Sequence, residues 1–413
     1  MRTLFSLAIC LHLVTACGRP AQSGAPSVGP NSSPLAGASP SSTAASLPAS
    51  SGAIDPEAKN YAYPFDVKTF RFQAQGQALT VAYLDVESQT PNGRVVVLLH
   101  GKNFSAAYWE PTIRSLTRSG YRVIAPDQIG FGKSSKPVGY HYSFNELAGN
   151  TRALLAAVGV QSSTIVGHSM GGMLAARYAL LFADKTEKLV LVDPIGLEDY
   201  AAVLPFRSVD ELYQRELAQT EEKVRAYVRN AYFGGQWRPE YEALVELQAG
   251  WLKHPEYRRV AWAAALTASM IITQPVVHDL PRLRVPTLLI VGLHDRAAVG
   301  KDAVSPEVAA KLGDFPVLGK QAARAIPGAQ LVELAAAGHL PQVDSFPEYE
   351  RALLGFLRED ERGSVGTVTP QRAHCDGIDE LRRHRRTAAA STDCNGVDEL
   401  IRGTRRTATV LTN

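Results

Sequence analysis

Cysteine is nearly absent from this chain of 413 residues. Its four cysteines lie near the two ends, at Cys10, Cys17, Cys375 and Cys394, and residues 18–374 contain none. A cysteine nucleophile or a cysteine-ligated metal site is therefore excluded from that central region. Nothing else in the sequence implies a metal or an organic cofactor, so we expect neither.

A strong charge of either sign is missing as well. The formal net charge is +3, and the central part has no basic stripe with interleaved aromatic residues, so nucleic-acid binding is not expected. The hydrophobic share of 45% and the charged share of 20% are those of an ordinary globular protein. The length suits one large or two ordinary domains.

Residues 1–16 have the pattern of a signal peptide. Arg2 gives a positive start, and the apolar run from Leu4 to Val14 is too short to span a membrane. The run closes with Val14-Thr15-Ala16-Cys17, which resembles the lipobox of bacterial lipoproteins, in which the cysteine is acylated and becomes the mature N-terminus. The resemblance implies an exported protein anchored to a membrane through Cys17. The alternative is a conventional secretory signal, cleaved near Ala16.

The residue after this cysteine bears on the membrane. Among Gram-negative lipoproteins a residue other than aspartate at this position favours the outer membrane, and here it is Gly18. The resemblance therefore implies an outer-membrane protein that faces the periplasm. Residues 17–60 are mainly Ser, Ala, Pro and Gly, which cannot bury enough surface to offset their ordering entropy, so we expect a flexible tether.

The C-terminal region, residues 361–413, is a second segment of biased composition. It is rich in Arg and Thr and contains a short repeat, in which Cys375-Asp-Gly-Ile-Asp-Glu-Leu is echoed as Cys394-Asn-Gly-Val-Asp-Glu-Leu. Two short copies are too few for a repeat fold. We expect a flexible tail without a catalytic role, and a disulfide between Cys375 and Cys394 is the alternative.

Between these ends, strand patterns alternate with helix patterns. Residues 94–100 form a continuous β-branched and leucine run, typical of a strand buried on both faces of a parallel sheet. The alternation predicts an α/β fold, with a mostly parallel central sheet and helices on both faces. The expected strands cover 70–74, 79–86, 94–100, 121–125, 163–166, 188–192, 285–292 and 330–334, and the expected helices 108–119, 144–158, 170–182, 319–325 and 347–357.

Residues 195–279 interrupt this alternation. Their pattern is helical throughout, and they carry Trp237, Trp251 and Trp262. We expect an all-helical cap over the carboxyl edge of the sheet, with an apolar pocket beneath it. The sheet domain is then split into a first part, residues 61–194, and a second part, residues 280–360.

The stretch Gly167-His168-Ser169-Met170-Gly171 joins an expected strand to an expected helix. So tight a turn exposes the serine oxygen and points the first N–H groups of the helix at a developing negative charge. Two further candidates follow later strands, namely Asp295 and His339. Because open α/β sheets place their sites at the carboxyl ends of strands, the three residues are candidates for a nucleophile, an acid and a base.

At this point the chain resembles the α/β-hydrolase superfamily, in which the triad occurs in the order Ser, Asp, His. The resemblance covers about residues 65–357 and rests on four segments: Leu-Leu-His100-Gly101, Asp127-x-x-Gly-x-Gly-x-Ser134, the serine turn, and Gly338-His339. It implies that Ser169 is the nucleophile, His339 the general base and Asp295 the acid that orients it. It also implies an oxyanion hole made of the backbone N–H groups of Lys102 and Met170.

Alternatives remain for individual roles. Asp193, after the preceding strand, is a second candidate for the acid, and Asn103 is a less favoured donor than Lys102. His294 is expected to be structural, and His100 and His168 are expected to hold loops by hydrogen bonds. Asp127 is expected to brace its glycine-rich turn.

The residue at the turn limits the reaction. Haloalkane dehalogenases and epoxide hydrolases of this superfamily use aspartate where this chain has Ser169, and proline iminopeptidases carry tryptophan where it has Met170. The leading hypothesis is a carboxylesterase that acts on a small or medium apolar ester through an acyl-enzyme on Ser169. The alternatives are a carbon–carbon bond hydrolase of dicarbonyl substrates and a binding protein that has lost turnover.

Overall fold

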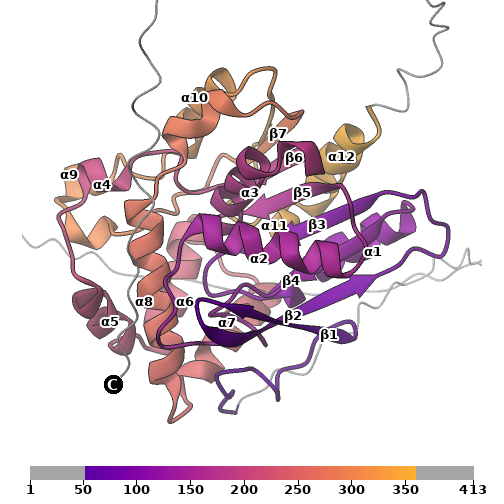
Figure 1. Cartoon of the computed structure of the whole chain (residues 1–413). Coiled ribbons are helices and arrows are strands. Elements are labelled where there is room, and N and C mark those ends of the chain that lie inside the picture. The colour runs from indigo at the N-terminus through magenta and orange to yellow at the C-terminus, as the bar shows by residue number, and fades with distance from the viewer. Residues whose placement is uncertain (1–51, 360–413) are drawn as a thin grey trace, which may run out of the picture. The chain divides into compact units, whose positions relative to one another are not determined.

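The computed structural model describes residues 52–359 (Figure 1). The expected signal peptide, Cys17, most of the tether and the C-terminal repeat with Cys375 and Cys394 lie outside this range. Within it, no helix is both long enough and apolar enough to cross a bilayer.

The core is one eight-stranded sheet with the order β1-β2-β4-β3-β5-β6-β7-β8. β1 and β2 are antiparallel, β2 is antiparallel to β4, and all other pairs are parallel, so the predicted mostly parallel sheet is confirmed. The strands are β1 (Val67–Ala74), β2 (Gln77–Val86), β3 (Val95–Leu99), β4 (Arg122–Pro126), β5 (Ser163–His168), β6 (Thr186–Val192), β7 (Thr287–Gly292) and β8 (Gln330–Leu334).

Helices cover both faces of the sheet, as Figure 1 shows. In β3, Val96 and Leu98 join one buried cluster, whereas Val97 and Leu99 join the other. This period of two is the pleat of a strand, and because both faces are apolar the strand must be covered twice. One face is covered by α1 (Glu110–Arg118) and α12 (Phe346–Leu357), and the other by α2 (Phe144–Ala157), α3 (Met170–Leu181) and α10 (Phe315–Ala325).

The segment between β6 and β7 is helical, as expected. No strand occurs in it, and its helices α5 and α8 run side by side (Figure 1). One turn is a π-helix, which the sequence pattern does not predict. The elements are α4 (Tyr200–Val203), α5 (Val209–Leu217), α6 (Glu221–Tyr227), the π-helix η3 (Val228–Tyr232), η4 (Pro239–Tyr241), α7 (Glu242–Leu252), α8 (Tyr257–Thr273) and η5 (Val277–Arg282).

The expected C-terminal boundary of the tether is wrong, because the folded part begins before residue 60. The prediction makes it flexible to residue 60, but Ile54 and Ala58 are fully buried. The N–H of Ile54 donates to the Gly250 carbonyl (2.9 Å), and the indole of Trp251 donates to the Asp55 carbonyl (3.1 Å). Gly250 has no side chain, which leaves the space that Ile54 fills. Residues 52–63, called the strap below, therefore pack against the cap, because one large apolar side chain offsets the ordering of a short polar segment.

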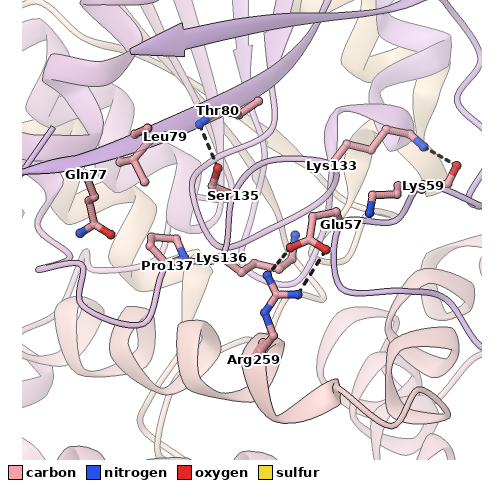
Figure 2. Close-up of a pocket in the computed structure, with 11 residues that line it drawn as sticks. Glu57, Lys59, Gln77, Leu79, Thr80, Lys133, Ser135, Lys136, Pro137 and Arg259 are labelled. Carbon is pink, nitrogen blue, oxygen red and sulfur yellow. Dashed lines mark hydrogen bonds and ion pairs between the residues drawn. The ribbon is translucent and has the colours of Figure 1, made fainter. Parts of the chain in front are cut away.

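A crevice of about 670 Å³ lies where the strap, β2, the loop after β4 and α8 meet (Figure 2). Arg259 of α8 pairs with Glu57 of the strap, and the Lys133 ammonium donates to the carbonyls of Ala58 (2.5 Å) and Lys59 (3.3 Å). Arg259 thus joins the cap to the strap, and Lys133 joins the strap to the sheet domain. None of Ser169, Asp295 and His339 lines it.

Replacing Ile54 with alanine tests the early start of the folded domain. Because this side chain is fully buried, the change leaves a cavity and should lower the free energy of unfolding by about 2–5 kcal/mol. Urea unfolding of Ile54→Ala gives the value. Val138→Ala, at a side chain that is 70% exposed, is the control and should be near neutral. Equal stability of the two variants would mean that the strap does not pack.

Candidate active site

Ser169 lies in a sharp turn between β5 and α3. Its φ is +57°, a left-handed conformation that is costly for a residue other than glycine. The two flanking glycines are required by close backbone approach. A Cβ on Gly167 would overlap the carbonyl of Gly171, and one on Gly171 would overlap the carbonyl of Leu99. The strained turn is therefore held by packing, and Ser169 is left 6% exposed at the start of a helix.

Asp295 and His339, which follow β7 and β8, are in direct contact. The His339 Nδ1 lies 2.6 Å from Asp295 Oδ2, and both side chains are buried. The other carboxylate oxygen accepts the Ala297 N–H at 2.7 Å, which fixes the plane of the carboxylate. Among the described residues, His339 Nε2 has no hydrogen-bond partner. A histidine held through Nδ1 with a free Nε2 is arranged to accept a proton there.

A chain of three hydrogen bonds links the turn at Ser169, called the elbow below, to the loop after β3 and to the loop of His339. The Gly101 N–H donates to the Tyr108 hydroxyl (3.3 Å), which lies 2.9 Å from His168 Nδ1, and His168 Nε2 lies 2.8 Å from the His339 carbonyl oxygen. A carbonyl only accepts, so Nε2 carries the proton and Nδ1 accepts from Tyr108. His168 therefore holds loops, in the way expected for it, and sets where His339 lies relative to Ser169.

Burial keeps both structural histidines neutral. It lowers the pKa of His168 well below its usual value, and the nearby His339 adds to this effect. Burial also lowers the pKa of His100, whose Nε2 accepts the Gln128 N–H at 2.8 Å and whose Nδ1 donates to the Gly101 carbonyl at 2.7 Å. Each ring uses one nitrogen as a donor and one as an acceptor, a pattern that needs the uncharged form.

The two residues expected to form the oxyanion hole belong to segments that adjoin Ser169. Met170 is the first residue of α3, where helical N–H groups have no intrahelical acceptor. The loop that carries Lys102 touches the elbow, because a Cβ on Gly101 would lie 3.1 Å from Ser169 Cβ. The Lys102 ammonium pairs with Glu216 of α5 at 2.8 Å, and both side chains are mostly buried. Lys102 thus connects the sheet domain to the cap through its side chain.

Asp193, the second candidate for the acid, has a different partner. Its Oδ1 accepts the Gly292 N–H at 2.9 Å, and its Oδ2 has no hydrogen-bond partner among the described residues. Burial and the neighbouring Asp295 raise the pKa of Asp193 well above its ordinary value, which favours its protonated form. The structure places Asp295, and not Asp193, against His339.

Asp127 lies at the centre of a separate brace. Its Oδ1 accepts the Ala106 N–H (2.7 Å), and its Oδ2 accepts the Lys133 N–H (2.7 Å) and the Tyr63 hydroxyl (2.6 Å). It therefore ties the loop after β3, its own glycine-rich turn and the strap to one carboxylate. The tie to the strap is absent from the sequence interpretation.

Sequence reasoning missed three residues around the site: Tyr108, Glu216 and Tyr232. The ring of Tyr232 lies 4.5 Å from that of His339, and Phe104 flanks Tyr232 at 6.3 Å. No local pattern marks them, since each acts through a partner distant in sequence. Within residues 52–359, no group of three His, Cys, Asp or Glu side chains could hold a metal ion.

Comparisons with known proteins agree with this geometry. The sequence model of the alpha/beta hydrolase fold matches residues 94–346. A solved structure from Pseudomonas aeruginosa, described as a probable hydrolytic enzyme, is 50% identical, covers 74% of this chain and 98% of its own, and has a TM-score of 0.73. The 2-hydroxy-6-oxo-6-phenylhexa-2,4-dienoate hydrolase of Comamonas testosteroni is 25% identical over 66% of this chain and 90% of its own.

A further solved structure is a membrane phospholipase A from a bacterium. It is 25% identical, covers 71% of this chain and 87% of its own, and has a TM-score of 0.53. These relatives carry different activities in their names, so similarity alone does not choose a substrate.

His168 should make stability depend on pH. Its folded-state pKa lies well below the unfolded value near 6.5, so the unfolded chain takes up a proton first and stability is lost as pH falls below about 6.5. Relative to His168→Gln, the wild type should lose up to about 1.4 kcal/mol more per pH unit below that value. Urea unfolding between pH 7.5 and 5 measures both slopes. His141→Gln, at an exposed histidine, should keep the wild-type slope. Equal slopes for all three proteins would contradict a buried, uncharged His168.

Proposed function

The chain belongs to the alpha/beta hydrolase fold family, and on this premise we propose that it is a serine hydrolase that cleaves carboxylic esters through an acyl-enzyme on Ser169. The observation that carries the proposal is the buried 2.6 Å contact between His339 Nδ1 and Asp295 Oδ2. Nε2 has no hydrogen-bond partner within residues 52–359, and His168 ties the strained Ser169 turn to the same loop. The buried His339–Asp295 contact and the strained Ser169 turn each cost folding free energy, and together they supply a nucleophile and its base.

The proposed reaction has two halves. The Ser169 oxygen attacks the ester carbonyl carbon while its proton passes to His339 Nε2, and Asp295 stabilises the imidazolium that forms. The carbonyl oxygen, now negative, accepts from the N–H groups of Lys102 and Met170. The carbon–oxygen bond to the alcohol breaks, and the alcohol leaves with the proton from His339. Water then attacks the acyl-serine in the same way and releases the acid.

The substrate class rests on the surroundings of Ser169. Phe104, Tyr108 and Tyr232 form an aromatic group beside His168 and His339, with ring-centre distances of 4.5 to 6.3 Å. Aromatic side chains bind apolar groups through their faces. We therefore favour a small or medium ester with an apolar acyl group.

Carbon–carbon bond hydrolysis is the second candidate. It is supported by the name of the Comamonas testosteroni relative, which matches over 90% of its own length. Activity on ring-cleavage dicarbonyl compounds, with none on simple esters, would replace the first proposal by this one.

Ser169→Ala tests the nucleophile. The change removes the attacking oxygen, so hydrolysis of a chain-length series of nitrophenyl esters should fall by about 10³-fold or more, and labelling by a fluorophosphonate probe should disappear. Ser162→Ala is the matched control, because Ser162 lies just before the opposite end of β5 and its hydroxyl donates to Glu187. Unchanged turnover in Ser169→Ala would refute the acyl-enzyme.

We also propose that Cys17 is acylated and holds the enzyme at the bacterial outer membrane, on the periplasmic side. The support is the Val14-Thr15-Ala16-Cys17 pattern after a short apolar run. Buried acyl chains contribute about 0.8 kcal/mol per methylene, so more than one chain gives a stable anchor.

Cys17→Ser should move the protein from the membrane fraction to the soluble fraction, since the acyl chains are lost. Immunoblots of the two fractions measure this, with Cys10→Ser as the control because that residue lies inside the expected signal peptide. Unchanged partitioning of Cys17→Ser would eliminate the anchor and leave the conventional secretory signal.

A further inference from the structure

The π-helix η3 of the cap ends against two catalytic loops. The N–H of Arg296, next to Asp295, donates to the Ala231 carbonyl (3.1 Å), and the N–H of His339 donates to the Tyr232 carbonyl (2.8 Å). Carbonyls at the end of a helix have no intrahelical donor and need partners elsewhere. Here two consecutive cap carbonyls accept hydrogen bonds from the two loops: Ala231 from the loop of Asp295 and Tyr232 from the loop of His339. π-turns of this kind are concentrated at functional sites.

Gly338 shows how close this approach is. A Cβ at position 338 would overlap the Tyr232 carbonyl oxygen, so the glycine is required by the cap. Its own N–H donates to Asp344 Oδ2 at 2.7 Å, which holds the loop from the other side. The absence of a side chain at Gly338, directly before His339, thus leaves the space that the Tyr232 carbonyl of the cap occupies.

His339 is therefore held from both domains. Its N–H bonds to the cap through Tyr232, and its carbonyl oxygen lies 2.8 Å from the Nε2 of His168 in the sheet domain. Its ring is held by Asp295 at one nitrogen and by the Tyr232 ring, 4.5 Å away and tilted by 33°. Tyr227 packs against Tyr232 at 5.2 Å, so the tyrosine ring has support behind it.

We propose that Tyr232 is a positioning residue for His339, and that the docked cap is a fixed part of the catalytic apparatus instead of a lid that swings away. The inference rests on the proposed serine hydrolase function. At this end of the cap, lifting η3 would break a bond to each of two catalytic loops, so we place the cap movement needed for substrate entry elsewhere. At the side that carries α5, the cap helix is joined to the sheet domain by side-chain ion pairs, Lys102–Glu216 and Arg215–Asp302.

Three variants separate the ring from the carbonyl. Tyr232→Ala removes the ring but keeps the carbonyl, and Tyr232→Phe keeps both. Gly338→Ala displaces the carbonyl. Misplacement of a catalytic group by about 1 Å costs about 10²-fold, so kcat should fall about 10²-fold in Tyr232→Ala and Gly338→Ala, with a smaller change in KM. Tyr232→Phe should retain wild-type kcat. Gly355→Ala, whose added methyl would have no atom of residues 52–359 within 4 Å, is the matched control and should be fully active.

A second readout is independent of turnover. The strong Nδ1–H···Oδ2 hydrogen bond of His339 should give a downfield proton resonance in the wild type, retained in Tyr232→Phe and in Gly355→Ala and lost or broadened in the other two variants. Because this signal needs no substrate, it tests the positioning role even if no ester is hydrolysed. Absence of both turnover and fluorophosphonate labelling in the wild type would instead overturn the proposed function.

Two outcomes would overturn the inference. Wild-type kcat and an intact downfield signal in Tyr232→Ala would show that the ring does not position His339. Equal losses of kcat in Tyr232→Phe and Tyr232→Ala would assign the effect to the hydroxyl, which makes Tyr232 a catalytic residue acting on the substrate. If Gly338→Ala does not fold, the two Tyr232 variants still decide the matter.

Discussion

The arrangement of the site depends on the two hydrogen bonds of the neutral His168 imidazole. His168 directly precedes Ser169 in the sequence. Its Nδ1 accepts a hydrogen bond from Tyr108, which follows β3, and its Nε2 donates one to the His339 carbonyl. A buried ring of this kind costs free energy unless both nitrogens are satisfied. Ser169, the loop of Gly101 and Lys102, and His339 therefore keep fixed relative positions, because a shift of one of them would leave a buried polar atom unpaired.

The cap extends the same logic across domains. Its π-turn accepts from the loops of Asp295 and His339, and its α7 receives the strap through Ile54. The strap in turn reaches Asp127, which binds the loop after β3 through Ala106. The cap thus contributes backbone hydrogen bonds to the site itself, whereas the strap is joined to the cap and, through the Tyr63 hydroxyl, to Asp127. The cap is a structural part of the catalytic centre as well as its cover.

Several costly features coincide at this centre. Ser169 and Asp193 have positive φ, His339 Nε2 and Asp193 Oδ2 are buried without a partner among the described residues, and burial and Asp295 raise the pKa of Asp193. Strain and unpaired polar groups persist only where the surrounding structure holds them. These features occur together around Ser169 and His339, whereas Arg259 and Lys133 at the Figure 2 crevice have polar partners.

The sequence by itself determined the alternation of strands and helices, the helical cap and the candidates Ser169, Asp295 and His339, because periodicity, buried runs and glycine-flanked turns are local signals. It left open whether Asp295 or Asp193 meets His339. It also missed the strap at Ile54 and the roles of Tyr108, Glu216 and Tyr232. Those depend on groups far apart in the chain meeting at one point, which only the tertiary structure decides, since hydrogen bonds and close packing act over a few ångströms in space whatever the distance in sequence.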